Sequence, residues 1–235
     1  MCTVSFVKSN DKIIITSNRD EQVLRPAIEP RSYLINGKQL TFPKDPKAGG
    51  TWFAIDENGT VLVLLNGATQ KHIWNPPYRK SRGLIVLHLI SDVSAIKCWE
   101  TIALEDIEPF TLVLYEEGEL YQLQWDGQQK TCVMPGITSD HIWSSATLYP
   151  LPVREQRAAW FNAFLATHNP VSETEMFGFH QYTEGTNTEN GLVINRNDTM
   201  KTLSITQVVI EHNELQLAYI DLINQKSFSN SFTIA

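Results

Sequence analysis

The order in which two kinds of hydrophobic pattern follow one another constrains the fold of this chain more than any other feature. Short alternating or β-branched segments come in pairs separated by turn residues, as at residues 51–55 and 61–65 around Glu57-Asn58-Gly59-Thr60. Longer segments with a helical period interrupt these pairs. Antiparallel hairpins interrupted by helices indicate an α+β fold and argue against a doubly wound parallel sheet.

The alternating segments predict strands at residues 2–7, 13–17, 51–55, 61–65, 111–115, 119–125, 128–134, 202–211 and 214–221. A helical period predicts two helical pieces within residues 81–105 and another helix at 153–167. Residues 22–47 contain Pro26, Pro30, Pro43 and Pro46, which predicts an extended surface excursion. Residues 171–191 are polar and stay ambiguous. Two sheets packed face to face with helices outside would use these elements well.

Length and composition narrow the function classes. The 235 residues contain no repeat or linker, so we expect one domain over residues 1–235. A net charge of −7 argues against a nucleic-acid partner, and no apolar run is long enough for membrane insertion. No signal peptide is visible and the three cysteines form no CxxC pair, so we expect a cytoplasmic protein without a metal. No dinucleotide or phosphate loop is present, so no cofactor is expected.

Cys2 is the residue whose chemistry is best suited to catalysis. Removal of Met1 would give one residue both a thiol and a free α-amine, whose ordinary pKa of about 8 suits a general base. A hairpin of residues 2–7 with 13–17 would bring Arg19 beside the thiol, where a cation lowers the thiol pKa, and Asp20 beside the amine. Cys2 could equally be a small buried residue that starts a strand, and residues 18–21 a polar strand exit.

Several of these positions belong to one set of motifs. The chain resembles the NRDE-motif family, whose eukaryotic members are called transport and Golgi organisation protein 2, from residue 1 to roughly residue 210. The matching blocks are Met1-Cys2-Thr3, Ser17-Asn18-Arg19-Asp20-Glu21, Gly49-Gly50-Thr51-Trp52, Leu65-Asn66, Ser81-Arg82-Gly83 and Ser144-Ser145-Ala146.

This resemblance implies a four-layer αββα sandwich of the N-terminal nucleophile hydrolase type, similar to choloylglycine hydrolase and penicillin V acylase. It implies that Cys2 is nucleophile and base, that Arg19 and Asp20 support it, and that Asn66 donates to the oxyanion. Adjacent residues of a strand point to opposite faces, however, and Arg19 and Asp20 are adjacent. Either Asp20 lies past the strand end, or Glu21 or Asn18 takes part of its role.

The remaining binding candidates each have a structural alternative. Trp52 either lines a pocket or is a core aromatic, and Arg82 either binds a carboxylate or stabilises the first turn of a helix. Asn66 is either the oxyanion donor or a turn residue. Ser145 stands where the related hydrolases have a second oxyanion asparagine, and Asn18 completes the binding candidates. A late arginine of those enzymes has two possible counterparts, Arg196 and Lys201.

The function that we expect is hydrolysis or acyl transfer at a non-peptide or small linear or cyclic amide, through a thioester on an N-terminal cysteine. This would make the chain a C–N hydrolase with a small-molecule amide or acyl ligand as its partner. The alternative is a non-catalytic carrier of haem or of a lipid or acyl ligand on the same scaffold. The sequence contains no C-x-x-C-H haem attachment signature.

Overall fold

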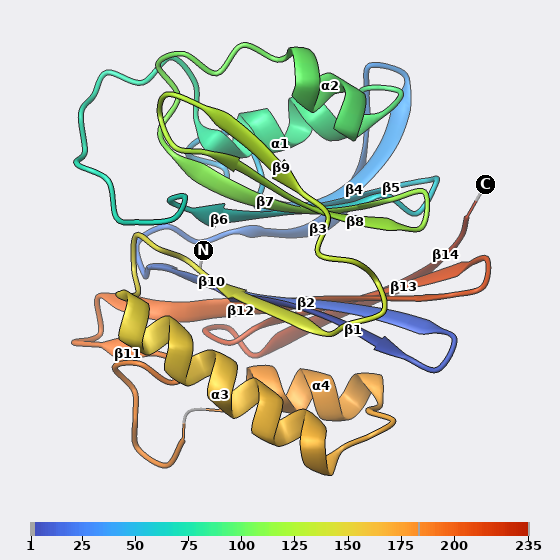
Figure 1. The fold of residues 1–235 in the computed structure, drawn as a ribbon, viewed down its shortest axis with the longest axis vertical. Coiled ribbons are helices and arrows are strands. Elements are labelled where there is room, and N and C mark those ends of the chain that lie inside the picture. Colours follow the sequence, from blue (N-terminus) through green and yellow to red (C-terminus); the bar gives the residue numbers. More distant parts are fainter. Residues whose placement is uncertain (1–2, 183, 235) are drawn as a thin grey trace.

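Two antiparallel sheets lie face to face, with helices on both outer faces, in the computed structural model, which describes residues 3–182 and 184–234 (Figure 1). Sheet 1 has the order β10-β1-β2-β12-β13-β14, with β11 paired to β12, and sheet 2 runs from β3 to β9 in sequence order. Helices α1 and α2 cover sheet 2, and α3 and α4 cover sheet 1 (Figure 1). The predicted α+β class and αββα layering are confirmed.

The elements have the following bounds. Sheet 1 contains β1 (Thr3–Ser9), β2 (Lys12–Gln22), β10 (His141–Ser144), β11 (Asn195–Arg196), β12 (Met200–Glu211), β13 (Glu214–Asp221) and β14 (Lys226–Thr233). Sheet 2 contains β3 (Ile28–Ile35), β4 (Lys38–Lys44), β5 (Phe53–Asp56), β6 (Val61–Asn66), β7 (Phe110–Glu116), β8 (Glu119–Trp125) and β9 (Lys130–Val133). The helices are α1 (Arg82–Ile90), α2 (Ala95–Thr101), α3 (Leu151–Thr167) and α4 (Glu173–His180).

Strand alternation in β1 and β2 divides the interior into two cores. Phe6 and Ile15 belong to the large apolar cluster between the sheets, whereas Val7 and Ile14 belong to the smaller cluster under α3 and α4. Because side chains alternate along a strand, each residue of β1 and β2 faces either the other sheet or the helices. This parity decides which polar side chains of β2 can meet in one site.

Residues 22–47 correct one prediction, because they form the β3–β4 hairpin at the edge of sheet 2 and not a surface excursion. Two of the prolines that favoured a loop, Pro26 and Pro46, lie outside the strands. Pro30 lies on the edge strand, where the register shifts between Ile28 and Arg31, so no ladder hydrogen bond to a further strand is lost.

Sheet 1 contains three strands that the sequence did not reveal, one of which is the two-residue β11, and β2 is longer than expected. The four-residue β10 pairs with β1, and the serine-rich β14 follows the two strands predicted at the end of the chain. The predicted hairpin is confirmed from Thr3 onward, but β2 extends to Gln22, so Asn18 to Glu21 lie within a strand and not at its exit.

The helices begin where local chemistry favours them. Both helical pieces of 81–105 and the helix at 153–167 are confirmed, and the ambiguous stretch contains α4, which a capping box of Ser172 and Glu175 starts. Among the described residues, no helix has the length and apolar character needed to cross a membrane.

Candidate functional site

A cavity of about 150 Å³ lies at one end of the interface between the sheets. Sheet 1 contributes Arg19 from β2, and sheet 2 contributes Asn66 from the end of β6. The start of α1 closes another side. The lining residues are Arg19, Glu21, Arg25, Asp45, Ala48, Gly50, Thr51, Trp52, Leu64, Asn66, Ser81, Arg82, Gly83 and Glu108. The predicted residues Arg19, Trp52, Asn66 and Arg82 therefore lie around one space.

Arg19 is the cation at the centre of this arrangement. Its side chain is only 2% exposed, and its guanidinium carbon lies 4.3 Å from the centroid of the Trp52 ring. Burial lowers the pKa of Arg19, and the nearby carboxylates of Glu21 and Asp45 oppose that change. Within the described residues, Nη1 of Arg19 has no hydrogen-bond partner and its guanidinium makes no ion pair. Arg19 is therefore available to an anion or to a developing negative charge.

The other two arginines of the cavity are paired with carboxylates. Arg25 contacts both Asp45 and Glu21, and a nitrogen of Arg82 lies 3.0 Å from a carboxylate oxygen of Glu108. Burial lowers the pKa of Arg82, while the charge of Glu108 raises it. The lining thus contains three arginines and three carboxylates, and Arg19 is the arginine that makes no ion pair among the described residues.

Two glycines explain why the Gly-Gly-Thr-Trp block packs against the start of α1. A Cβ on Gly50 would lie 2.3 Å from the backbone carbon of Gly83, and a Cβ on Gly83 would lie 2.8 Å from the backbone oxygen of Thr51. Real side chains do not approach backbone so closely, so both positions require glycine. This contact brings Trp52 and the unpaired Ser81 hydroxyl to the same cavity.

Asn66 lies at the end of β6, and the backbone around it is fixed by Ser145. The Ser145 hydroxyl donates to the Asn66 backbone oxygen over 2.7 Å, and the backbone N–H of Thr147 donates to the same oxygen. The side-chain oxygen of Asn66 has no partner among the described residues. Ser145 thus holds Asn66 in place and does not itself line the cavity.

Asn18 and Asp20 lie on the opposite face of β2, toward the helices, as the alternation of a strand requires. The Asn18 side-chain amide donates to the backbone oxygens of His180 and Leu192, over 2.9 and 2.8 Å. Asp20 accepts hydrogen bonds from the hydroxyls of Tyr149 and Thr202. Asp20 lies inside the strand and not past its end, and neither Asn18 nor Asp20 lines the cavity.

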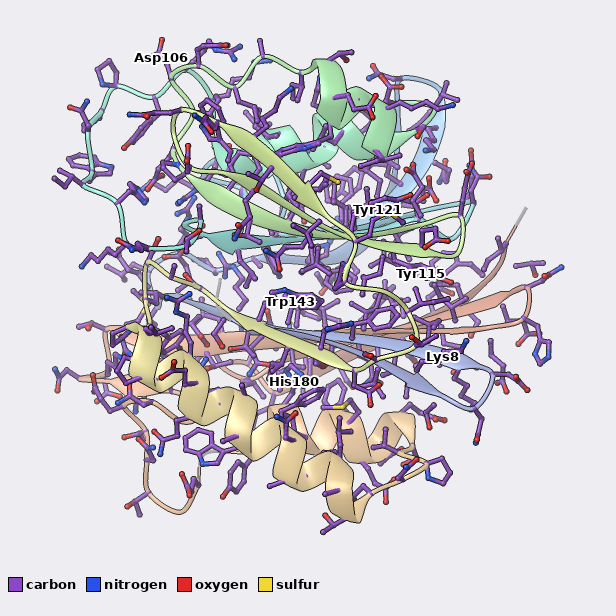
Figure 2. All side chains as sticks on the ribbon, viewed as in Figure 1. Lys8, Asp106, Tyr115, Tyr121, Trp143 and His180 are labelled. Carbon is purple, nitrogen blue, oxygen red and sulfur yellow. The ribbon has the colours of Figure 1, made fainter. Side chains whose placement is uncertain are left out.

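His180 completes the network around Asn18. It is fully buried between sheet 1 and α3 (Figure 2), its Nδ1 contacts the Asn18 side-chain oxygen, and its Nε2 lies 2.7 Å from the Ser5 hydroxyl. Burial, followed by the positive charge of Arg157, lowers the pKa of His180 to about 3. A neutral imidazole donates through Nδ1 to Asn18 and accepts from Ser5 through Nε2, so this network ties α4 to sheet 1.

The start of β1 is anchored by a buried arginine that sequence reasoning missed. Arg157 of α3 donates to the Thr3 hydroxyl and to the backbone oxygens of Asn190 and Gly191. Its guanidinium carbon lies 3.6 Å from the centroid of the Tyr149 ring, and Tyr149 in turn donates to Asp20. The one sequence signal for this role is that Arg157 interrupts the apolar face of the predicted helix.

Some sequence candidates lie elsewhere or outside the described residues. Cys2 is outside them. Arg196 pairs with Glu189, and Lys201 pairs with Asp198. Neither Arg196 nor Lys201 lines the cavity. Among the residues that the structure describes, no cluster of histidine, cysteine, aspartate and glutamate is arranged to hold a metal ion.

Comparison with known proteins identifies the family and the fold. The family model for Transport and Golgi organisation 2 matches residues 1–227, so the chain belongs to this family. A search of curated proteins finds no match.

Solved structures that share this fold include N-terminal nucleophile hydrolases. A mutant of the conjugated bile acid hydrolase from Clostridium perfringens superposes with a TM-score of 0.65 and 10% identity, over 98% of this chain and 92% of that one. A second variant of that enzyme gives 0.63 and 11%, over 97% and 92%. The N-acylethanolamine-hydrolyzing acid amidase orthologue of Caenorhabditis elegans gives 0.62 and 11%, over 88% and 92%.

Proposed function

We propose that this member of the Transport and Golgi organisation 2 family is an amide hydrolase or acyltransferase whose nucleophile is Cys2, exposed by removal of Met1. One observation carries the proposal. Thr3 of β1 is paired with Asn18 of β2, and the next residue of β2 is Arg19, the cation of the cavity without a carboxylate partner among the described residues. Cys2 is bonded to Thr3, so the chain enters β1 beside the wall that Arg19 forms.

The similar solved structures support this assignment. The two bile acid hydrolase structures carry replacements of a cysteine at position 2 and of an arginine. These are the residue types that we assign here to the nucleophile and to its support. The third structure is named an N-acylethanolamine-hydrolyzing acid amidase. The similar structures therefore come from two different hydrolases.

In the first step of the proposed reaction, the Cys2 thiol passes its proton to the α-amine of the same residue, and the thiolate attacks the amide carbonyl carbon. The positive charge of Arg19 favours the thiolate over the thiol. Asp20 is the carboxylate that we assign to the amine. Its contact with Tyr149, which packs on Arg157, links it to the Arg157–Thr3 contact at the start of β1.

As the sulfur–carbon bond forms, the carbonyl oxygen becomes an oxyanion, and the Asn66 side-chain amide donates to it. A fixed donor of this kind contributes about 3–4 kcal/mol to transition-state stabilisation. The carbon–nitrogen bond breaks, the α-ammonium protonates the leaving amine, and a thioester remains on Cys2. Water, or an acceptor amine in a transfer reaction, then attacks the thioester and restores the thiol.

The cavity limits the substrate to a small reacting group. About 150 Å³ is the volume that accommodates a molecule of benzene size, so only the amide and its nearest atoms fit. Leu64 is the one large aliphatic side chain of the lining, and most of the remainder is polar or charged. This favours a compact polar amide, linear or cyclic, over a large apolar group inside the cavity.

A screen of small linear and cyclic amides for amine release, with mass spectrometry of acid-quenched samples, tests the proposal. A turned-over amide should leave its acyl group as a thioester adduct on Cys2. The Cys2→Ala variant should lose both turnover and adduct, whereas Cys132→Ala, which changes an exposed cysteine of β9, should retain both.

Full activity of Cys2→Ala on any amide that the wild-type chain hydrolyses would refute the proposal. Binding of haem or of an acyl ligand in the cavity, with no turnover of any amide, would also contradict it and would assign the scaffold to a carrier.

A further inference from the structure

The segment between β6 and α1, residues 67–81, loops away from the body of the molecule (Figure 1, teal). Contacts hold both of its ends. The His72 side chain lies 3.0 Å from a carboxylate oxygen of Glu108, and the Arg79 guanidinium donates to the backbone oxygen of Ala103 over 2.8 Å. Between these anchors, Ile73 is 91% exposed and Trp74 is 70% exposed.

Two consecutive, large apolar side chains at such exposure are unusual for this chain. Elsewhere on the described surface, apolar side chains that are at least as exposed as Trp74 occur one at a time, as with Val93 at 95%. Single exposed apolar residues are normal in folded proteins, whereas adjacent ones on a projecting loop mark an interaction surface. Trp74 is also the most exposed tryptophan among those described.

The loop is basic although the whole chain is acidic. No aspartate or glutamate occurs between Glu57 and Asp92, while the chain carries a net charge of −7. Lys71 and Lys80 make no ion pair with any described residue, and the Arg79 guanidinium contacts backbone oxygens and no carboxylate.

The neighbouring acidic residues are Glu105, Asp106 and Glu108, on the segment that anchors the loop. Asp106 lies at the edge of the molecule above the loop (Figure 2). The Glu108 carboxylate is paired with Arg82. The carboxylates of Glu105 and Asp106 therefore remain beside the three cations Lys71, Arg79 and Lys80, and the loop region keeps a positive balance on an acidic protein.

We propose that the 67–81 loop docks this protein on a bilayer surface that contains anionic lipid. Ile73 and Trp74 would enter the boundary between headgroups and acyl chains, where tryptophan is favoured, and the cations of the loop would contact lipid phosphates. An apolar tip with flanking lysines and arginines supplies both signals that stable surface binding requires. The loop lies on the surface and does not cross the bilayer.

Docking has a geometric consequence for the cavity. The loop leads directly into Ser81 and Arg82, which line the cavity, and Leu24, 94% exposed, is next to the lining residue Arg25. A bilayer under the loop would therefore adjoin the cavity. The proposal is independent of whether the cavity is catalytic, because it rests on the exposed residues of the loop alone.

Co-sedimentation of the full chain with phosphatidylcholine vesicles, with and without half phosphatidylglycerol, tests the proposal at about 0.1 M salt. Wild-type protein should sediment with the anionic vesicles and much less with the neutral ones, and Trp74 emission should shift to the blue. The double variant Ile73→Ser, Trp74→Ser should bind the anionic vesicles at least about tenfold less, because it removes two apolar insertions. Val93→Ser, a matched exposed apolar change, should bind as wild type.

The charge contribution has its own matched pair. Lys71→Gln with Lys80→Gln should weaken binding by about tenfold or more, since each cation near an anionic surface contributes about fivefold. Lys97→Gln with Lys226→Gln makes the same change in net charge at other exposed positions and should have little effect.

All these positions are exposed or in the loop, so folding should be unaffected, and thermal unfolding of each variant checks this. Failure of the wild-type chain to sediment with either vesicle, full binding by the double variant, or equal losses in the two lysine pairs would each overturn the proposal.

Discussion

Acidification should destabilise this protein through one buried histidine before its carboxylates become protonated. His180 is fully buried and its pKa is lowered from 6.5 to about 3, first by burial and then by Arg157. Below pH 6.5 the unfolded chain binds a proton at this residue and the folded chain does not. Stability therefore rises with pH across this interval and falls as the solution is made more acidic.

The size of the effect follows from the difference between the two states. While only the unfolded chain is protonated, each pH unit changes the free energy of unfolding by about 1.4 kcal/mol. Between pH 6.5 and pH 5, His180 should thus remove about 2 kcal/mol of stability. Glu173, whose pKa is lowered from 4.5 by hydrogen bonding and by Lys12, loses its contribution only at lower pH and therefore adds little to the change in this interval.

Equilibrium unfolding in urea at half-unit steps from pH 7 to pH 5 measures this slope. The control is His180→Gln, which removes the titrating group and keeps a polar side chain. The difference between the two slopes should approach 1.4 kcal/mol per pH unit. Proton uptake on unfolding at pH 5.5 gives a second measure, with about one more proton for the wild-type chain. Equal slopes and equal proton uptake would refute the argument that Asn18 and Ser5 hold a neutral histidine.

Three further predictions concern the cavity and its supports. Gly50→Ala should destabilise the fold by about 1–3 kcal/mol in urea unfolding, because the new Cβ meets the Gly83 backbone. Gly178→Ala, in open space on α4, should be neutral or stabilising. A larger loss of stability in Gly178→Ala than in Gly50→Ala would contradict the packing. Arg157→Met should lower the free energy of unfolding by at least about 3 kcal/mol, since it leaves several buried acceptors unpaired, and an unchanged melting temperature would exclude that role. Asn66→Ala should lower kcat on any amide substrate by about 100-fold or more while thiol alkylation of the protein stays at the wild-type rate; a loss of alkylation alone would argue against an oxyanion role.

The sequence predicted the layers of this fold better than it predicted their edges. Hairpins such as β5–β6 and the helix pair α1–α2 follow local patterns, because turn residues and apolar period act over a few residues. β3 and β14 were not predicted, because edge strands tolerate proline, serine and asparagine and their sequences therefore resemble loops. Their strand conformation comes from a neighbouring strand and not from local propensity.

The candidate site likewise contains residues that local motifs predicted and residues that only the tertiary structure brings together. Arg19, Trp52, Asn66 and Arg82 were reached through motifs, and the structure gathers them around one cavity. The alternation of a strand correctly predicted that Arg19 and Asp20 face apart, although Asp20 proved to lie within β2.

The partners that complete the cavity left no local signal. Arg25, Asp45 and Glu108 come from three separate segments, and only the packed sheets bring their charges together. Arg157 reaches Thr3 across more than half the chain, so its role depends on tertiary structure alone.

The reactivity of Cys2 tests the central claim most directly. Intact mass before and after a limiting dose of iodoacetamide near pH 7 shows both whether Met1 is removed and how many thiols react. Background should be low, because burial raises the pKa of Cys98 to about 11 and also raises the pKa of Cys132. The account predicts a mass without methionine and one fast adduct on Cys2, slowed in Arg19→Ala. A mass that retains Met1, or a Cys2 that reacts no faster than free cysteine, would contradict it.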